Sequence, residues 1–149
     1  MKRQERIERV RAIEREFWAA AFAANLLDEA LQKDSGLLAA EAFKVPDVRN
    51  WKKNLEGTYL IRMFAEFEAT LRDVWARFFK RDTHPRMVDL IDAIAGYQFV
   101  PDDVIDGAHA VRRYRNSLVH EGGEEAATLP FGHARSFLGS YLSRLPTDW

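Results

Sequence analysis

The sequence predicts an all-α fold, an antiparallel bundle of about five helices. Three observations support this prediction. Apolar residues recur at steps of three and four over long stretches, no segment shows sustained alternation of apolar and polar residues, and helix-stopping or helix-starting residues, Gly and Pro among them, separate the periodic stretches. A helical period without a strand period is typical of helix packed on helix.

The length and composition are those of one soluble domain covering residues 1–149. The chain is 47% apolar and 30% charged, and at this length it can bury a core without disulfides or a structural metal. It has no cysteine, which excludes a thiol nucleophile, a Cys-ligated zinc site and an iron–sulfur cluster. Its 22 Lys and Arg against 23 Asp and Glu exclude a globally basic nucleic-acid binder but leave room for a local basic site.

The first half of the chain predicts two long helices joined by a connector. One apolar seam indicates a helix from about Arg3 to Lys33, which Asp34, Ser35 and Gly36 stop. Residues 37–50 form the connector, with Pro46 in its irregular part, so that residues 1–50 comprise a helix and a connector and residues 51–149 the remaining core. The second helix runs from about Lys53 to Lys80. Its expected core residues are Leu60, Met63, Phe64, Phe67, Leu71, Val74, Trp75 and Phe78.

Three shorter helices follow. Thr83 and Pro85 start one that reaches about Ala95. Pro101, Asp102 and Asp103 open the next, which runs to His120 and is closed by Gly122 and Gly123. Thr128 and Pro130 start the last, to about Leu145.

Two charges fall on apolar helix faces. Arg115 lies in the middle of the face made by Val104, Ala108, Val111, Leu118 and Val119, and Glu68 lies among Ile61, Phe64, Trp75 and Phe79. Arg62, Glu66, Asp73, Arg77 and Lys80 share the expected solvent side of the second helix. An isolated buried charge is costly, so we expect Glu68 and Arg115 to pair, either as a purely structural pair or as part of a site.

The residues around Arg115 favour a phosphate site. Asn116 and His120 are four residues apart and share one edge of the helix, with Arg112 one turn earlier. His120 sits at a helix C-terminus, whose dipole favours a cation. A guanidinium, an amide and a titratable imidazole within two turns suit a phosphate group.

The run Arg115-Asn116-Ser117-Leu118-Val119-His120 resembles the signature of HEPN domains, in which an Arg and a His are separated by four residues with Asn after the Arg. Its position, late on a helix before a Gly-containing break and a final helix, is similar, as is an acidic residue, Glu68, on an earlier helix. The resemblance covers about residues 54–145. One departure is Gly122, where many ribonuclease members have a Tyr two residues after the His.

This resemblance implies a homodimer whose two motif helices face each other across a cleft, with endonucleolytic RNA cleavage that needs neither metal nor other cofactor. Many such proteins belong to toxin–antitoxin or anti-phage systems, so a regulatory antitoxin is a further expected partner. Two copies of His120 and Arg115 would divide the base, acid and charge-stabilising roles, with Asn116 positioning the phosphate and Glu68 orienting Arg115. Arg112 and Arg113 are the expected RNA-binding residues.

Two alternatives remain open: a HEPN-like domain that binds RNA, a nucleotide or a partner protein without catalysis, and a helical interaction protein in which Arg115 and Glu68 are architectural. The eleven residues from Phe17 to Leu27 are too few to span a bilayer and follow a leader with several Glu, so we expect a cytoplasmic protein without membrane contact. Trp18 and Phe22 lie outside the apolar seam of the helix predicted from Arg3 to Lys33. They are interpreted as core residues, with a partner contact as the alternative.

Asp89 and Asp92 are expected on a solvated surface. A metal site made by Asp102, Asp103 and Asp106 with His109 is a minor possibility, because the helix dipole already explains acids in a first turn.

Overall fold

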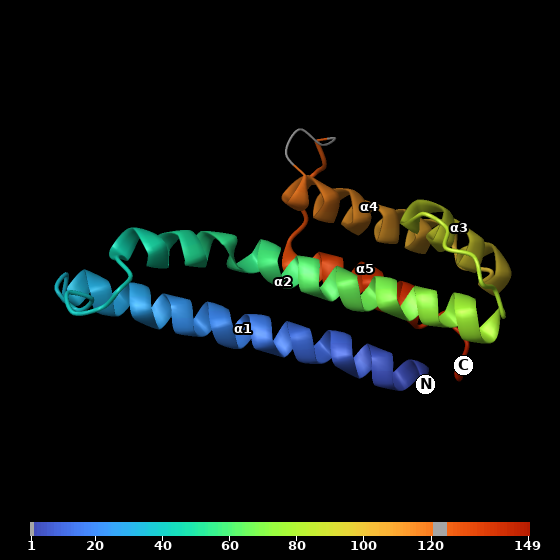
Figure 1. Ribbon diagram of the computed structural model, residues 1–149, viewed down its shortest axis with the longest axis horizontal. Coiled ribbons are helices and arrows are strands. Elements are labelled where there is room, and N and C mark those ends of the chain that lie inside the picture. Colours follow the sequence, from blue (N-terminus) through green and yellow to red (C-terminus); the bar gives the residue numbers. More distant parts are fainter. Residues whose placement is uncertain (1, 121–124) are drawn as a thin grey trace.

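The computed structural model describes residues 2–120 and 125–149, and within them the fold is all-helical, as predicted (Figure 1). Gly122 and Gly123, the expected stop signal, lie outside the described residues. Two long helices, α1 (Arg3–Lys33) and α2 (Val45–Asp73), form an antiparallel hairpin. None of the described helices combines the length and the apolar character that crossing a membrane requires.

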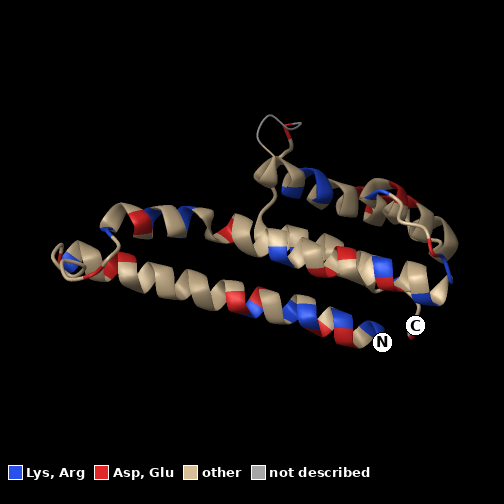
Figure 2. Cartoon of the chain, in the orientation of Figure 1, with Lys and Arg blue, Asp and Glu red and all other residues tan. Residues whose placement is uncertain are grey.

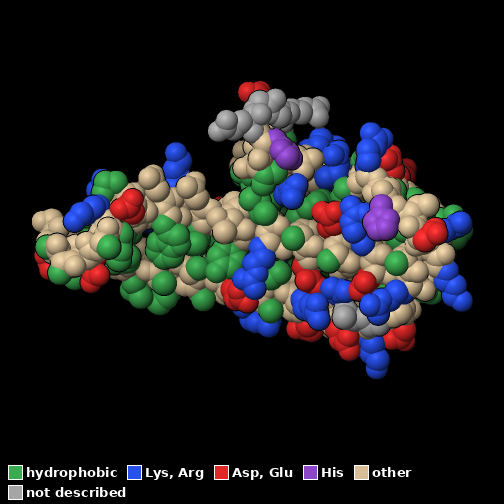
Figure 3. All heavy atoms as spheres, viewed as in Figure 1, with side chains coloured by type: hydrophobic (Ala, Val, Ile, Leu, Met, Phe, Trp, Pro, Cys, Tyr) green, Lys and Arg blue, Asp and Glu red, His purple; other side chains and the backbone are tan. Residues whose placement is uncertain are grey.

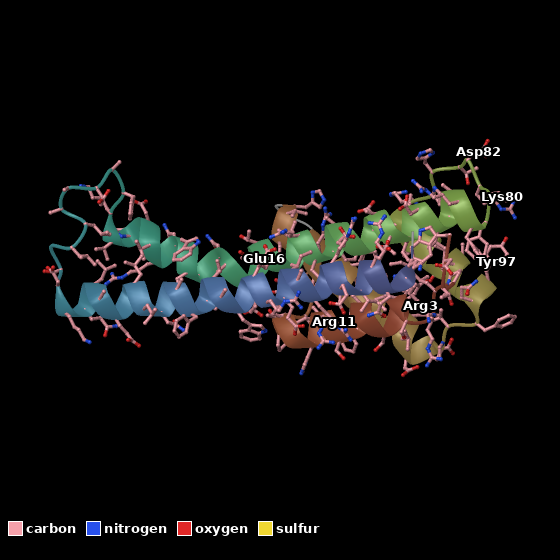
Figure 4. The ribbon with its side chains drawn as sticks, turned by 90° about the horizontal axis from the view of Figure 1, so that it is seen from below. Arg3, Arg11, Glu16, Lys80, Asp82 and Tyr97 are labelled. Carbon is pink, nitrogen blue, oxygen red and sulfur yellow. The ribbon has the colours of Figure 1, made fainter. Side chains whose placement is uncertain are left out.

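The three shorter helices pack on one end of this hairpin. They are α3 (Met87–Gln98), α4 (Asp102–Val119) and α5 (Phe131–Leu142). Helix α4 lies on the opposite side of α2 from α1, and α5 runs beside the first half of α1 and the second half of α2 (Figures 1 and 4). The main core sits where α2, α4 and α5 meet, around Phe64, Phe67 and Tyr141.

The far end of the hairpin projects beyond α4 and α5. We call residues 20–52 the arm, because in Figure 1 they extend past both of these helices. A small separate cluster of buried residues, Leu31, Leu38 and Val48, holds α1, the connector and α2 together there.

Helix α2 begins earlier and ends differently than expected. It starts at Val45, and Pro46 stands in its first turn. Proline is tolerated there because the backbone N–H that it lacks would have no acceptor within the helix. The assignment of Pro46 to an irregular connector was therefore wrong. The last turn of α2, η1 (Val74–Phe78), is a π-helix, whose extra residue rotates the chain. Phe78, expected in the core, is consequently 46% exposed, and Phe79 packs on Tyr97 at 4.8 Å instead.

Candidate functional site

Helix α4 brings the Arg-Asn-His motif to its C-terminal end. Pro101 and the acidic Asp102 and Asp103 start the helix, where the N-terminal dipole favours negative charge. The backbone N–H of His120 donates to the carbonyl of Asn116 (3.1 Å), and His120 then turns to extended backbone, which ends the helix. The His120 side chain is exposed, so its imidazole is open to a ligand.

Arg115 is partly buried and is held from two sides. Its Nη1 donates to Asn116 Oδ1 (3.2 Å), and its guanidinium carbon lies 5.9 Å from the centre of the Phe64 ring on α2. A guanidinium over an aromatic face is a favourable cation–π arrangement. Its Nε is buried without a hydrogen-bond partner, and the Asn116 bond is the only one that this side chain makes within the described residues. A guanidinium has five N–H donors, so Arg115 keeps donors for an anion.

The expected pair between Glu68 and Arg115 is wrong. Glu68 Oε1 accepts from Nη2 (2.7 Å) and Nε (3.0 Å) of Arg72 on its own helix, and both side chains are about one third exposed. Arg72 also reaches the carbonyl of Pro85 (3.4 Å), which lies before α3. A helical wheel gives the direction of a side chain but not its height along the bundle. Arg115 meets Phe64, one turn before Glu68, whereas Arg72 lies one turn after it.

The charge that the structure buries most is Arg6 on α1. Its Nη1 donates to Glu66 Oε1 (2.8 Å), its Nη2 pairs with Asp73, and only 8% of its side chain is exposed. Glu66 and Asp73 therefore face α1, which corrects their assignment to the solvent side of α2. Extending the α1 seam of Val10 and Ile13 one turn toward the N-terminus reaches Arg6, so this signal was present in the sequence.

The second half of α4 is purely cationic. From residue 107 to residue 119 it carries Arg112, Arg113 and Arg115 and no acid, and Figure 2 shows this half of the helix with blue but no red. Arg113 is exposed. Arg112 is partly buried, its Nε is buried without a partner, and its side chain makes no ion pair within the part of the chain that the structure describes.

A groove of about 300 Å³ lies beside the motif, between α2, α4 and the segment before α5. Its walls include Tyr114 and Leu118 on α4, the first just before the motif and the second within it, and Glu56 and Gly57 on α2. Glu56 Oε1 accepts the backbone N–H of Phe131 (2.7 Å) and so caps the start of α5. Burial, and secondly the negative charge of Glu56, raise the pKa of the Tyr114 phenol, which therefore stays a neutral hydrogen-bond donor. Sequence reasoning did not identify this groove, because its residues come from three separate segments.

Asp102, Asp103 and Asp106 of α4 form no metal site with His109 among the described residues. His109 Nε2 instead contacts Asp92 Oδ1 on α3 (2.7 Å), and Asp89 pairs with Arg86 (2.8 Å). Both aspartates are largely exposed, as predicted. Within residues 2–120 and 125–149, no group of three or more His, Asp or Glu side chains is arranged to hold a metal ion.

Comparison with known proteins gives no relative: no family model, no curated protein and no solved structure matches the chain.

Proposed function

We propose that the chain is a HEPN-type endoribonuclease that cleaves RNA with its own side chains, through Arg115, Asn116 and His120. The observation that carries the proposal is the composition of the α4 end. Arg115 and Asn116 are hydrogen-bonded to each other, His120 is exposed at the helix end, and α4 carries no acid from residue 107 to residue 119. This is the set of groups that the HEPN resemblance requires.

The reaction needs a base, an acid and positive charge. A neutral His120 accepts the proton of the ribose 2′-OH, and the 2′-oxygen forms a bond to phosphorus while the bond from phosphorus to the 5′-oxygen breaks. A protonated imidazole donates its proton to the departing 5′-oxygen. The free donors of Arg115 stabilise the negative charge on the phosphorane, and the Asn116 amide orients the phosphate. The products carry a 2′,3′-cyclic phosphate and a 5′-hydroxyl.

The reaction uses one imidazole as base and another as acid, so the site needs two chains. His120 is the only histidine of the motif, so the acid and the base come from the His120 residues of two copies related by a two-fold axis. Leu118 (40% exposed) and Val119 (39% exposed), which the sequence assigned to the core face of α4, stand open beside His120 and offer apolar surface for this contact. We call it the α4 contact.

The corresponding biological role is that of a toxin or effector in a bacterial toxin–antitoxin or anti-phage system, acting in the cytoplasm. A nuclease that attacks cellular RNA must be silenced until it is needed. An antitoxin that covers the open end of α4 would do this by blocking both His120 and the α4 contact.

The test is cleavage of a mixed RNA pool in EDTA. We expect RNA to be cut, DNA to resist because it lacks the 2′-OH, and His120→Ala to lower the rate by about 100-fold or more, the usual contribution of a general acid or base. His133→Ala is the matched control, because His133 is also exposed but lies on α5, and it should cleave at the wild-type rate.

A non-catalytic RNA-binding module is the second candidate. It is favoured by Arg115, which is held by Phe64 and Asn116 and has no carboxylate to orient it for catalysis. In that case RNA stays intact in both EDTA and Mg²⁺, yet binds with an affinity that falls in Arg112→Ala and Arg115→Ala. Intact RNA that also fails to bind would refute both candidates.

A further inference from the structure

Helix α1 has a second apolar face that no part of the described chain covers. Trp18 is 55% exposed, Phe22 is 67% exposed and Leu26 is 52% exposed, so the assignment of Trp18 and Phe22 to the core was wrong. The three residues recur every four positions and therefore form one stripe along the helix. We call Trp18, Phe22 and Leu26 the α1 stripe.

The α1 stripe cannot be covered by the hairpin itself. The α1 residues buried against the rest of the bundle, Val10, Ile13, Phe17, Ala24 and Leu31, lie on the opposite side of the helix at about 100° per residue. Helix α5, the other neighbour of α1, begins at Phe131, whose ring lies 4.2 Å from that of Phe17, and from there it runs toward the N-terminal end of α1 (Figure 4). A helix that is apolar on two opposite faces is typically buried on both.

The surface around the α1 stripe is uncharged. No Lys, Arg, Asp or Glu occurs from Phe17 to Leu27, and exposed Ala19 and Ala23 flank the three large side chains. Figure 3 shows hydrophobic side chains gathered over this part of the molecule, whereas charged side chains crowd the other end. Small residues beside large ones allow another helix to approach closely and let the large side chains interdigitate.

The charges at the two ends of the α1 stripe identify the partner. Arg15 and Glu29 lie on the same side of the helix, one at each end, both are exposed, and neither makes an ion pair within the described residues. If a second α1 packs antiparallel about a two-fold axis at Phe22, Phe22 meets its counterpart, Trp18 meets Leu26 and Arg15 meets Glu29. The Phe22 contact lies on the axis and occurs once, whereas the other two contacts occur twice, which is the self-complementarity of an isologous interface.

We infer that the α1 stripe binds a second copy of this chain through an antiparallel α1–α1 contact. Beyond these ion pairs, Arg11 of one copy would face Lys33 of the other. Glu8 offsets this repulsion, because its Oε1 lies 2.6 Å from Arg11 Nη1 of the same chain. The contact region from Arg15 to Glu29 is about 21 Å long at 1.5 Å per residue, so the interface is at the small end of specific interfaces and we expect a dissociation constant in the micromolar range.

The α1–α1 contact is distinct from the proposed α4 contact, because α1 and α4 lie on opposite sides of α2 (Figure 1). A chain that uses both contacts assembles beyond a dimer. Disrupting one contact then leaves the dimer that the other contact holds. The two proposals therefore fail separately.

The first experiment measures molecular mass by sedimentation at tens of micromolar. We expect Phe22→Glu to lower the mass to that of the dimer held by the α4 contact, or to that of the monomer if the α4 contact does not form. It should weaken the α1–α1 contact by about 30-fold or more, because it places two like charges at the centre of the contact. The matched control is Phe99→Glu, the same substitution at a 90% exposed Phe outside α1, and it should keep the wild-type mass. An unchanged mass in Phe22→Glu overturns the inference.

The second experiment tests the antiparallel register by charge exchange. Arg15→Glu and Glu29→Arg should each weaken association several-fold by placing like charges opposite each other, and the double variant should recover the wild-type affinity to within about twofold. A double variant no tighter than the single ones overturns this register. Binding of the α1 stripe to a membrane instead would overturn the inference of a second copy. It would be seen as flotation with phosphatidylglycerol vesicles that is lost in Phe22→Glu, while Phe22→Glu leaves the mass of the protein in solution unchanged.

The third experiment uses the absence of native cysteine. Phe22→Cys places one thiol at the two-fold axis, and we expect mild oxidation to convert most of the protein to a disulfide-linked pair. Phe99→Cys controls for random collision. Equal cross-linking of the two variants contradicts an axis at Phe22.

Discussion

Replacing Arg6 by Met tests whether the bundle depends on the one strongly buried cation among its described residues. The substitution keeps an unbranched apolar side chain of similar length with good helix propensity, so it removes mainly the guanidinium. Glu66 and Asp73 are then left on the α1 side of α2 without Arg6. Loss of one partner of a buried ion pair costs roughly 3–5 kcal/mol. Because the side chains of Glu66 and Asp73 are 19% and 25% exposed, water stabilises them in part, and we expect about 3 kcal/mol.

Chemical unfolding followed by circular dichroism measures this loss, with every variant at the same protein concentration because association adds to apparent stability. At this chain length about 3 kcal/mol corresponds to a fall in Tm of roughly 6–12 °C. The control is Arg9→Met. Arg9 also approaches Glu66, at 3.6 Å, but 53% of its side chain is exposed, so the loss should stay under about 1 kcal/mol.

A rescue separates charge from packing. Adding Glu66→Gln and Asp73→Asn to Arg6→Met removes the two carboxylates that lost their partner, and more than half of the lost stability should return. If Arg6→Met costs no more than Arg9→Met, the three-residue network does not stabilise the hairpin and the reasoning fails.

Three further predictions concern the core, the pH response and the corrected site. Gly107→Ala should destabilise by about 1–3 kcal/mol in unfolding experiments, because a Cβ at this position would lie 2.6 Å from the Phe137 ring of α5. The buried Tyr141 hydroxyl donates to the Ile91 carbonyl (2.6 Å), and burial, followed by the negative charge of Asp92, raises the pKa of this phenol. Tyrosinate absorbance should therefore show Tyr141 staying protonated above about pH 10. The free energy of unfolding should fall as the pH rises from about 10 toward the raised pKa, because only the unfolded state ionises this phenol in that range. Glu68→Gln should change stability by less than about 0.5 kcal/mol and RNA cleavage by less than about twofold, because its carboxylate pairs only with Arg72, whose side chain is 39% exposed.

Each of these has a control or a contradicting result. Gly96→Ala matches Gly107→Ala, because a Cβ there meets nothing within 4 Å, and it should not destabilise. Titration of Tyr141 at the ordinary pKa of a phenol, about 10, would contradict the pH prediction. A large loss of cleavage in Glu68→Gln would return Glu68 to the site despite its pairing with Arg72.

The sequence predicted those features that depend on one helix at a time. The bounds of α1, Arg3–Lys33, agree with the structure. Helix α4 ends at Val119, one residue before the expected His120. Both predictions follow from local apolar periodicity and end signals. The π turn after Asp73 has no such signal. Its extra residue reverses the exposure of Phe78, which a fixed angle of 100° per residue cannot anticipate.

Pairings between helices were not predictable, because they depend on the height at which helices cross. The wheel correctly directed Arg115 toward the bundle, but only the structure shows that it reaches Phe64 and not Glu68. Helix α2 also buries two faces, one against α1 and one against α4 and α5. Glu66 and Asp73 consequently lie at an interface that a single-core interpretation assigns to solvent.

The arm has a consequence for how the protein unfolds. Between residues 20 and 52 the hairpin is held mainly by α1 against α2, with the small cluster of Leu31, Leu38 and Val48 at its end, so its local opening should require much less free energy than global unfolding. Backbone amides of the arm should therefore exchange with deuterated water before those around Phe64 and Phe67. If two arms meet through α1, this exchange slows as protein concentration rises, and the least stable segment of the monomer becomes the one that association orders most.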